Sequence, residues 1–200
     1  MTSKIFSIDR HRFKTDGDGI TTLIAFHGCP LQCKYYINDI CHKDIDTYSY
    51  TIEELYSIVS IDDIYFRMPN GGIVFGGGEP ILQSQYIKDF ISICPEEWNF
   101  RIETSLYCDK KQILDLIDCI DEWIIDIKDM NPAIYLKYTE CNNDIVLENI
   151  SLLTSLIPKD KILFRIPHIP NYNTEKDIQY SISRLEHLGR LDVFEYEMEL

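Results

Sequence analysis

Two cysteines, Cys29 and Cys33, have the residue type and the spacing to bind a metal centre. They stand in the segment GCPLQCKYY, in which Gly28 and Pro30 favour a tight turn. Iron–sulfur clusters use closely spaced cysteines, because the thiolates of one loop must reach neighbouring irons. A CxxxC pair alone does not distinguish a metal site from two structural thiols. The chain has seven cysteines, an odd number without a secretory signal, so ligation explains the clustered group better than a disulfide framework does.

Four further groups of polar or glycine residues follow apolar segments along the chain. They are Gly76, Gly77, Gly78 and Glu79 in GGGEP; Glu103, Thr104 and Ser105; Asp126 and Lys128; and Arg165, which leads to His168. Each apolar segment has the character of a buried strand. In α/β barrels the active site forms at the carboxyl ends of the strands. We therefore predict that these groups and the cysteine pair meet at one rim.

Several of these groups have a structural interpretation beside the functional one. No lysine follows GGGEP, so it is not a phosphate loop; it is either a tight turn closed by Pro80 or a polar cradle for a cationic amino group. Asp126 and Lys128 alternate along a strand and so share a face, as a buried pair or as a solvated strand end. Arg165 either pairs with a nearby carboxylate or binds the carboxylate of a substrate.

The elements that would position these groups alternate between strands and helices. Strands are predicted over residues 20–27, 73–75, 100–106, 123–127, 161–167 and 192–200. Helices are predicted over residues 51–62, 81–94, 144–157 and 174–188, with a further helix capped by Asp109. Parallel strands need crossover helices, so the alternation predicts an α/β fold with a parallel sheet, either a barrel or a doubly wound sheet. No linker-rich boundary divides the chain, and we predict a single domain over residues 1–200.

Charge and hydropathy limit the partners that the chain is expected to bind. The net charge is −14, which opposes binding to a phosphate backbone, so nucleic acid is not a predicted partner. No run of about 18 apolar residues predicts a membrane span. The first residues, MTSKIFSIDRHRF, lack the apolar region of a signal peptide. These features predict a cytoplasmic protein.

Taken in order, the segments resemble the radical S-adenosylmethionine enzymes that activate glycyl radical enzymes, a family that includes pyruvate formate-lyase activating enzyme. The resemblance extends from about Asp16 to Asn173 and rests on TDGDGITTLIAFHGCPLQCKYY, GGGEPIL, IETSL, IIDIKDMN and ILFRIPHIPNYN. It implies a partial (β/α)6 TIM-like barrel of the radical S-adenosylmethionine type. It also implies a [4Fe–4S] cluster that binds S-adenosylmethionine and cleaves it reductively. The resulting 5′-deoxyadenosyl radical would take a glycine hydrogen from a partner glycyl radical enzyme, with electrons supplied by a flavodoxin- or ferredoxin-type reductant.

The resemblance also assigns roles to individual residues. Cys29 and Cys33 match cluster ligands, and Tyr35 matches an aromatic position near the adenine. The other matched positions are Gly76, Gly77, Gly78 and Glu79 as the cradle for the amino group of the cofactor; Asp126, Lys128 and Arg165 as its polar contacts, with Asp126 and Lys128 as catalytic candidates; Ser105 at the same rim; and Glu103, Thr104 and Asp126 as a monovalent cation site.

Two departures from the family pattern concern the cluster and the end of the chain. The third cluster cysteine of the CxxxCxxC pattern falls at position 36, where this chain has Tyr36. A phenol with a pKa of about 10 is a poor iron ligand, although its position still lies beside the cofactor site. Cys41 is the nearby thiol that could take its place. The sequence ends at Leu200 on the sixth predicted strand, before a histidine that reaches the cofactor in the family, so we expect a truncated barrel.

Three hypotheses about function follow. The first is a radical enzyme whose cluster is held by Cys29, Cys33 and Cys41. The second is an inactive relative that keeps the scaffold as a binding module, and Tyr36 leaves the choice between these two open. The third is a structural zinc protein that uses the same three cysteines together with His42.

Overall fold

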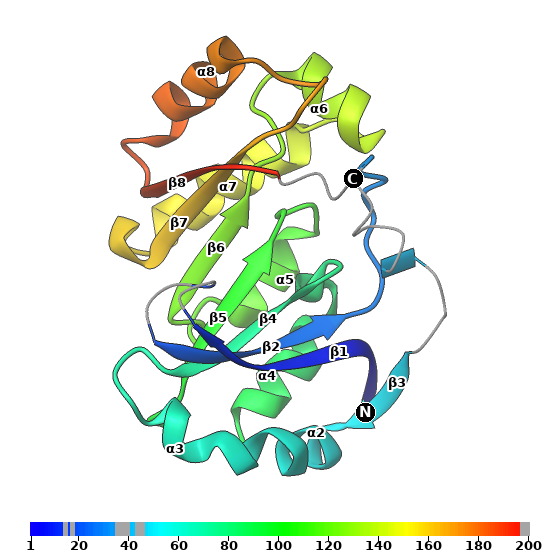
Figure 1. Ribbon diagram of the computed structural model, residues 1–200, viewed down its shortest axis with the longest axis vertical. Coiled ribbons are helices and arrows are strands. Elements are labelled where there is room, and N and C mark those ends of the chain that lie inside the picture. Colours follow the sequence, from blue (N-terminus) through cyan, green and yellow to red (C-terminus); the bar gives the residue numbers. More distant parts are fainter. Residues whose placement is uncertain (14–15, 17–18, 35–40, 43–46, 197–200) are drawn as a thin grey trace.

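An eight-stranded sheet forms the centre of the molecule (Figure 1). The computed structural model describes residues 1–13, 16, 19–34, 41–42 and 47–196. The strands lie in the order β3-β1-β2-β4-β5-β6-β7-β8. Six of them pair in parallel: β2 (Ile20–Phe26), β4 (Gly72–Gly77), β5 (Asn99–Thr104), β6 (Glu122–Asp126), β7 (Ile162–His168) and β8 (Arg190–Glu195). The predicted α/β class and its six parallel strands are therefore confirmed.

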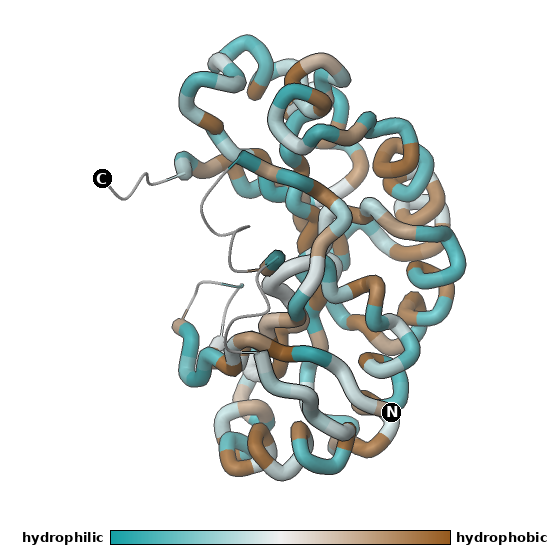
Figure 2. Tube along the Cα trace, turned by 90° about the vertical axis from the view of Figure 1, so that its right-hand side faces the viewer, coloured by the Kyte–Doolittle hydropathy of each residue, from teal (hydrophilic) through white to brown (hydrophobic). Residues whose placement is uncertain are grey.

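Helices cross over between the parallel strands and pack on one another. The helical segments are α2 (Ile52–Val59), η1 (Ser60–Asp62), α3 (Asp63–Phe66), η2 (Pro80–Gln83), α4 (Ser84–Ile91), α5 (Lys110–Leu116), α6 (Pro132–Thr139), α7 (Asp144–Leu156), η3 (Lys159–Lys161) and α8 (Glu175–Leu185). α4 contacts α2 and α5, and α5 contacts α7. Figure 2 shows the described chain as an arc that is open on one side. Because β3 and β8 end the strand order without pairing to each other, the sheet is a partial barrel.

The longest elements that were not expected from the sequence are two strands and a helix. β1 (Thr2–Phe13) and β3 (Tyr48–Thr51) form antiparallel pairs at the β2 side of the sheet. Their residues are mixed in polarity, and much of β1 stays exposed. β1 is a strand because it pairs with β2, not because of an apolar pattern of its own. The third element, α6, begins with Asn131 as its N-cap and Pro132 in its first turn. That pairing of residue types favours a helix start and could have revealed α6.

Local signals at the helix ends are confirmed where they were strongest. Thr51 caps α2 as predicted: its hydroxyl accepts from the Glu54 backbone N–H at 3.2 Å, and its own N–H donates to the Glu54 carboxylate at 2.8 Å. The predicted helix over residues 81–94 is a short 3₁₀ segment, η2, followed by α4. Pro80 opens η2, because a proline needs no backbone donor in a first helical turn.

Apolar side chains fill the space between the sheet and the helices. All residues of β4 are buried except Gly77, as expected for a strand covered on both faces. The Phe75 ring packs between Phe90 and Phe100, with ring centroids 6.0 and 6.1 Å apart. Burying one such side chain contributes about 1.5–3 kcal/mol. The core therefore holds β4 and the loop that follows it in a fixed position.

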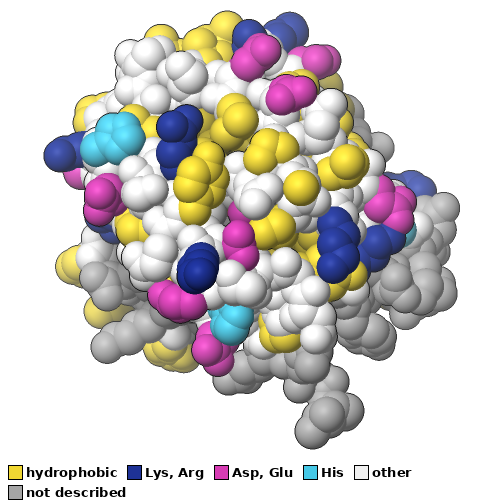
Figure 3. All heavy atoms as spheres, turned by 90° about the horizontal axis from the view of Figure 1, so that it is seen from above, with side chains coloured by type: hydrophobic (Ala, Val, Ile, Leu, Met, Phe, Trp, Pro, Cys, Tyr) yellow, Lys and Arg dark blue, Asp and Glu magenta, His cyan; other side chains and the backbone are white. Residues whose placement is uncertain are grey.

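One face of the molecule shows no concentration of basic side chains. Seen from above, Lys and Arg side chains are spread among apolar and acidic ones and do not dominate that face (Figure 3). No helix in the described part of the chain is long and apolar enough to cross a membrane.

Candidate functional site

The cysteine loop, residues 28–33, and the GGGEP turn are joined by backbone hydrogen bonds. β2 and β4 run side by side, with Ala25 opposite Gly76. At their ends the Gly78 N–H donates to the Phe26 carbonyl and the Glu79 N–H donates to the Gly28 carbonyl, both at 2.8 Å. The first two predicted groups therefore meet at one rim, as expected from parallel pairing.

Glycine is required at Gly78 because of this close approach. A Cβ atom there would lie 2.2 Å from the Gly28 carbonyl oxygen, a backbone atom that cannot turn aside. Gly77 has a φ of +95°, a conformation that glycine adopts without strain. The GGGEP segment is thus a tight turn that fixes the start of the cysteine loop, whatever it binds.

Glu79 ties the GGGEP turn to the end of β5. Its buried carboxylate accepts hydrogen bonds from the Thr104 hydroxyl at 2.6 Å, the Ser105 N–H at 2.9 Å and the Ser105 hydroxyl at 2.5 Å. Burial raises the pKa of Glu79, while these donors favour the charged form. These contacts give Glu79, Thr104 and Ser105 a shared structural role. The sequence predicted Glu79 only as part of a cradle for a cationic amino group and did not predict these hydrogen bonds.

Asp126 and Lys128 share a face, as predicted, and form an ion pair at the end of β6. The Lys128 Nζ lies 2.5 Å from Asp126 Oδ2 and 3.4 Å from the Tyr196 hydroxyl. Burial disfavours the charged amine and is the largest single effect, but Asp126 and the other acidic groups around it together hold the pKa of Lys128 above its ordinary value. Asp126 Oδ1 is buried and has no hydrogen-bond partner among the described residues. A protonated amine and a spare carboxylate oxygen are therefore available at this point of the rim.

Arg165 on β7 pairs with carboxylates of β5 and β8. Its Nη1 lies 3.0 Å from Glu103 Oε1, and its Nε lies 3.4 Å from Asp192 Oδ2. The guanidinium also lies 4.7 Å above the Phe194 ring. Of the two sequence-based interpretations of Arg165, pairing with a carboxylate is therefore observed in this structure.

Glu103 is expected to make stability depend on pH. Burial and the nearby Asp16 raise the pKa of Glu103 to about 7, against a usual value of 4.5. The folded protein thus binds this proton more tightly than the unfolded chain, so its contribution is present below about pH 4.5 and is lost as the pH rises through about 7. Glu103→Gln keeps an acceptor for Arg165 without the titration.

The measurement for Glu103 is a pair of urea unfolding series at pH 4.5 and pH 8. Between pH 4.5 and pH 8, the unfolding free energy of wild type should change unfavourably by about 1–3 kcal/mol more than that of Glu103→Gln. A difference between the two proteins that stays constant with pH would contradict the prediction.

The three candidate cluster ligands belong to one region. Cys29 and Cys33 are partly buried, and Cys41 is buried. The Cys41 carbonyl accepts from the Gly28 N–H at 3.0 Å, which places Cys41 against the start of the cysteine loop. Burial, followed by Glu79, raises the pKa of Cys29 to about 12; burial, followed by Cys33, raises that of Cys41 to about 11. Cysteine thiols at these three positions are the residue type that ligates the irons of a cluster.

A single-ion site is not formed by these residues. His42 Nε2 lies 3.1 Å from the Leu31 carbonyl oxygen, rather than joining the thiols. Within the described ranges, no three Cys, His, Asp or Glu side chains are grouped as ligands of one metal ion. The zinc interpretation therefore gains no support. Cysteine thiols are the residue type that holds iron–sulfur clusters, so the three cysteines fit that group by their chemistry.

The predicted cation site is not supported either. Thr104 donates to Glu79, Glu103 accepts from Arg165, and Asp126 accepts from Lys128. Each of the three residues thus has another partner. Tyr35 and Tyr36 lie outside the described residues.

Sequence reasoning missed the contribution of α6 to this rim. The Gln32 N–H of the cysteine loop donates to the Thr139 carbonyl at 3.0 Å. The Cys141 thiol lies 3.9 Å from the Pro30 carbonyl oxygen. Figure 1 shows α6 beyond the end of β2, where the chain after β2 approaches it. The cap at Asn131 was the available signal, but nothing in the sequence shows that this helix contacts the cysteine loop.

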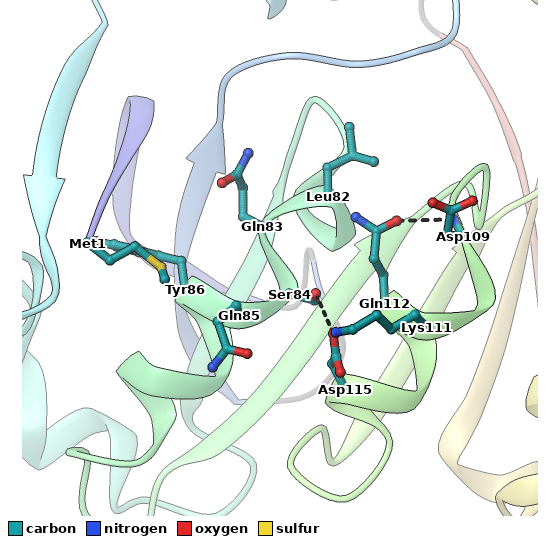
Figure 4. A pocket seen from close by; sticks show the side chains of 10 residues that line it. All are labelled: Met1, Leu82, Gln83, Ser84, Gln85, Tyr86, Asp109, Lys111, Gln112 and Asp115. Atoms are coloured by element: carbon teal, nitrogen blue, oxygen red, sulfur yellow. Dashed lines mark hydrogen bonds and ion pairs between the residues drawn. The ribbon is translucent and has the colours of Figure 1, made fainter.

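A pocket of about 340 Å³ lies elsewhere (Figure 4). Its walls come from η2, α4 and α5 together with Met1, and the Ser84 hydroxyl donates to Asp115 within it at 3.1 Å. None of the predicted site residues lines this pocket. The candidate site is therefore the rim formed by the strand ends.

Comparison of the chain with known protein families identifies the class to which this fold and this rim belong. A family model described as the radical SAM superfamily matches residues 23–180, and the chain belongs to that superfamily. Within it, the chain is homologous to enzymes that activate glycyl radical enzymes.

Three relatives illustrate this homology. The (2S)-3-sulfopropanediol dehydratase activating enzyme of Klebsiella oxytoca is 37% identical over 128 residues, which cover 64% of this chain and 40% of that protein. The 4-hydroxyphenylacetate decarboxylase activating enzyme of Clostridioides difficile strain 630 is 30% identical over 164 residues, covering 82% and 50%. A crystal structure of a domain of pyruvate-formate lyase-activating enzyme from Bacteroides vulgatus has a TM-score of 0.53 at 26% identity, covering 62% of this chain and 78% of that chain. The chain thus spans half or less of the length of the first two relatives.

Proposed function

We propose that this protein binds a [4Fe–4S] cluster and S-adenosylmethionine and activates a glycyl radical enzyme. The observation that carries the proposal is the junction of the cysteine loop with the GGGEP turn, at the strand ends of a radical SAM fold. That junction joins the thiols to a glycine turn, and the Asp126–Lys128 pair stands at the carboxyl end of β6 in the same parallel sheet. When bound, the cluster would cleave S-adenosylmethionine reductively and so supply a 5′-deoxyadenosyl radical.

In this proposal the cluster ligands are Cys29, Cys33 and Cys41. The first two stand on the loop after β2, and Cys41 is held beside that loop through the Gly28 N–H. The GGGEP turn lets the backbone approach a bound cofactor, because glycines leave its surface open. Arg165 would exchange its contact with Glu103 for a carboxylate of the cofactor.

Lys128 and Asp126 are proposed to orient the cofactor and to control charge around it. The protonated Lys128 amine can donate a hydrogen bond to the cofactor, and the spare Asp126 oxygen can accept one from it. Tyr196 completes this pair through its 3.4 Å contact with the Lys128 Nζ. Because the pair is largely shielded from water, its interactions are stronger than those of a surface pair.

The proposed partners are a glycyl radical enzyme and a flavodoxin- or ferredoxin-type reductant. Named relatives activate a dehydratase, a decarboxylase and pyruvate formate-lyase 2. They support the class of partner without choosing among these enzymes.

The deciding experiment is anaerobic reconstitution with iron and sulfide, followed by reduction in the presence of S-adenosylmethionine. We expect a brown, oxygen-sensitive protein with iron and sulfide in equal amounts and release of 5′-deoxyadenosine. Absence of iron in wild type, together with its appearance in Tyr36→Cys, would instead support the inactive binding module.

A further inference from the structure

Tyr135 has a buried hydroxyl group that the fold leaves without a partner. The side chain lies on α6 and is 2% exposed. Its hydroxyl oxygen has no hydrogen-bond partner among the described residues. Leaving such a group unpaired costs about 1–3 kcal/mol, so buried hydroxyls are normally bonded. Tyr86, another buried tyrosine, follows the usual pattern: its hydroxyl lies 3.1 and 3.2 Å from the Tyr50 and Thr51 carbonyl oxygens.

The surroundings of Tyr135 belong to the proposed cluster site. Of the ionisable groups that act on its hydroxyl, Cys33 has the largest effect, followed by Lys128 and Cys141. α6 is also fixed to the cysteine loop, because Thr139 at its end accepts the Gln32 N–H at 3.0 Å. The unpaired hydroxyl is therefore held on a helix that contacts the loop carrying Cys33.

The hydroxyl can act there only as a neutral donor. A phenol has an ordinary pKa of about 10 and is therefore neutral near pH 7. A neutral phenol next to thiolate or sulfide sulfur donates its proton in a hydrogen bond. Such bonds to sulfur are among the factors that set the reduction potential of a cluster, because they stabilise the more negative, reduced state.

We propose that Tyr135 donates a hydrogen bond to a sulfur atom of the cluster site at the cysteine loop and thereby raises the reduction potential of the bound cluster. This inference rests on the proposed function, since it requires a cluster. It assigns Tyr135 as a positioning and tuning residue, not as an iron ligand. The energy of one hydrogen bond corresponds to up to about a tenfold change in the ratio of oxidised to reduced cluster at a fixed potential.

The test compares reconstituted wild type, Tyr135→Phe and Tyr86→Phe. The reduction potential is measured by a redox titration in which electron paramagnetic resonance monitors the reduced cluster. Fe–S stretching bands are recorded by resonance Raman spectroscopy. We expect Tyr135→Phe to keep wild-type iron content and to shift to a more negative potential, by about a three- to tenfold change in the oxidised-to-reduced ratio. Tyr86→Phe is the matched control, because it removes a buried hydroxyl whose partners lie elsewhere, and its potential should equal that of wild type.

The possible results separate this inference from the proposed function. A full cluster with unchanged potential and Fe–S bands in Tyr135→Phe would overturn the role of Tyr135 and leave the proposed function intact. Equal shifts in Tyr135→Phe and Tyr86→Phe would also overturn it, because the effect would then be a general loosening of the fold. Wild-type protein that takes up no iron or sulfide would overturn both proposals.

Discussion

Cys41→Ala is expected to lose the iron–sulfur cluster while keeping the fold. Position 36, where a third cluster cysteine would be expected, holds Tyr36, so the proposed set has no thiol to spare. Removing Cys41 would leave Cys29 and Cys33 as the only two thiols of the proposed ligand set. We expect iron in the reconstituted protein to fall from roughly four atoms per chain to below about one. Iron and sulfide assays and the visible absorbance of anaerobic samples measure this.

Two other cysteines provide matched controls for Cys41. The Cys94 and Cys119 thiols are partly buried and donate to the Phe90 and Leu116 carbonyls, within their own turns. Cys94→Ala and Cys119→Ala should therefore keep wild-type iron content. Retention of a full cluster in Cys41→Ala would refute the proposed ligand set. In that case Cys141, 3.9 Å from the Pro30 carbonyl oxygen, is the next thiol to replace.

Gly78→Ala is expected to destabilise the protein strongly, whether or not a cluster is bound. Its Cβ atom would lie 2.2 Å from the Gly28 carbonyl oxygen, so the GGGEP turn and the cysteine loop would have to separate. Separation breaks the hydrogen bond between the Glu79 N–H and the same oxygen. We expect a loss of about 3 kcal/mol or more in the free energy of unfolding, together with poor iron uptake.

Gly28→Ala is the matched control for this steric argument. A Cβ atom at Gly28 would meet nothing within 4 Å, although its φ of +96° strains an alanine. We therefore expect a smaller loss, about 1–2 kcal/mol. Urea unfolding of both metal-free variants gives the comparison, and an equal loss in the two would contradict the steric argument for Gly78.

Much of the fold could be predicted because its signals are local. Apolar strands alternating with capped helices already indicate a parallel α/β sheet, and the Thr51 capping box is formed as expected. The position of the polar groups after each strand predicted the rim. β1 and β3 could not be predicted in this way, because they are strands through pairing with β2 and with each other rather than through their own pattern.

The partners within the site could be predicted only in part. Asp126 and Lys128 are two residues apart, and strand geometry alone puts them on one face. By contrast, the hydrogen bond of the Glu79 carboxylate with Ser105, 26 residues further along the chain, was not predicted. Tyr135 was not identified at all, since its importance depends on a contact between α6 and the cysteine loop.

The sequence by itself determined the order of the six parallel strands and of most helices between them, the rim on which the chemistry collects and the kinship with radical SAM activating enzymes. It did so because these properties depend on neighbouring residues and on motifs. The tertiary structure alone decided that Gly78 must clear the Gly28 carbonyl, that Cys41 lies beside the cysteine loop and that Tyr135 keeps an unpaired hydroxyl on the helix that contacts this loop. These contacts join residues far apart in the chain, so they follow from sheet register and helix packing, which no local spacing encodes.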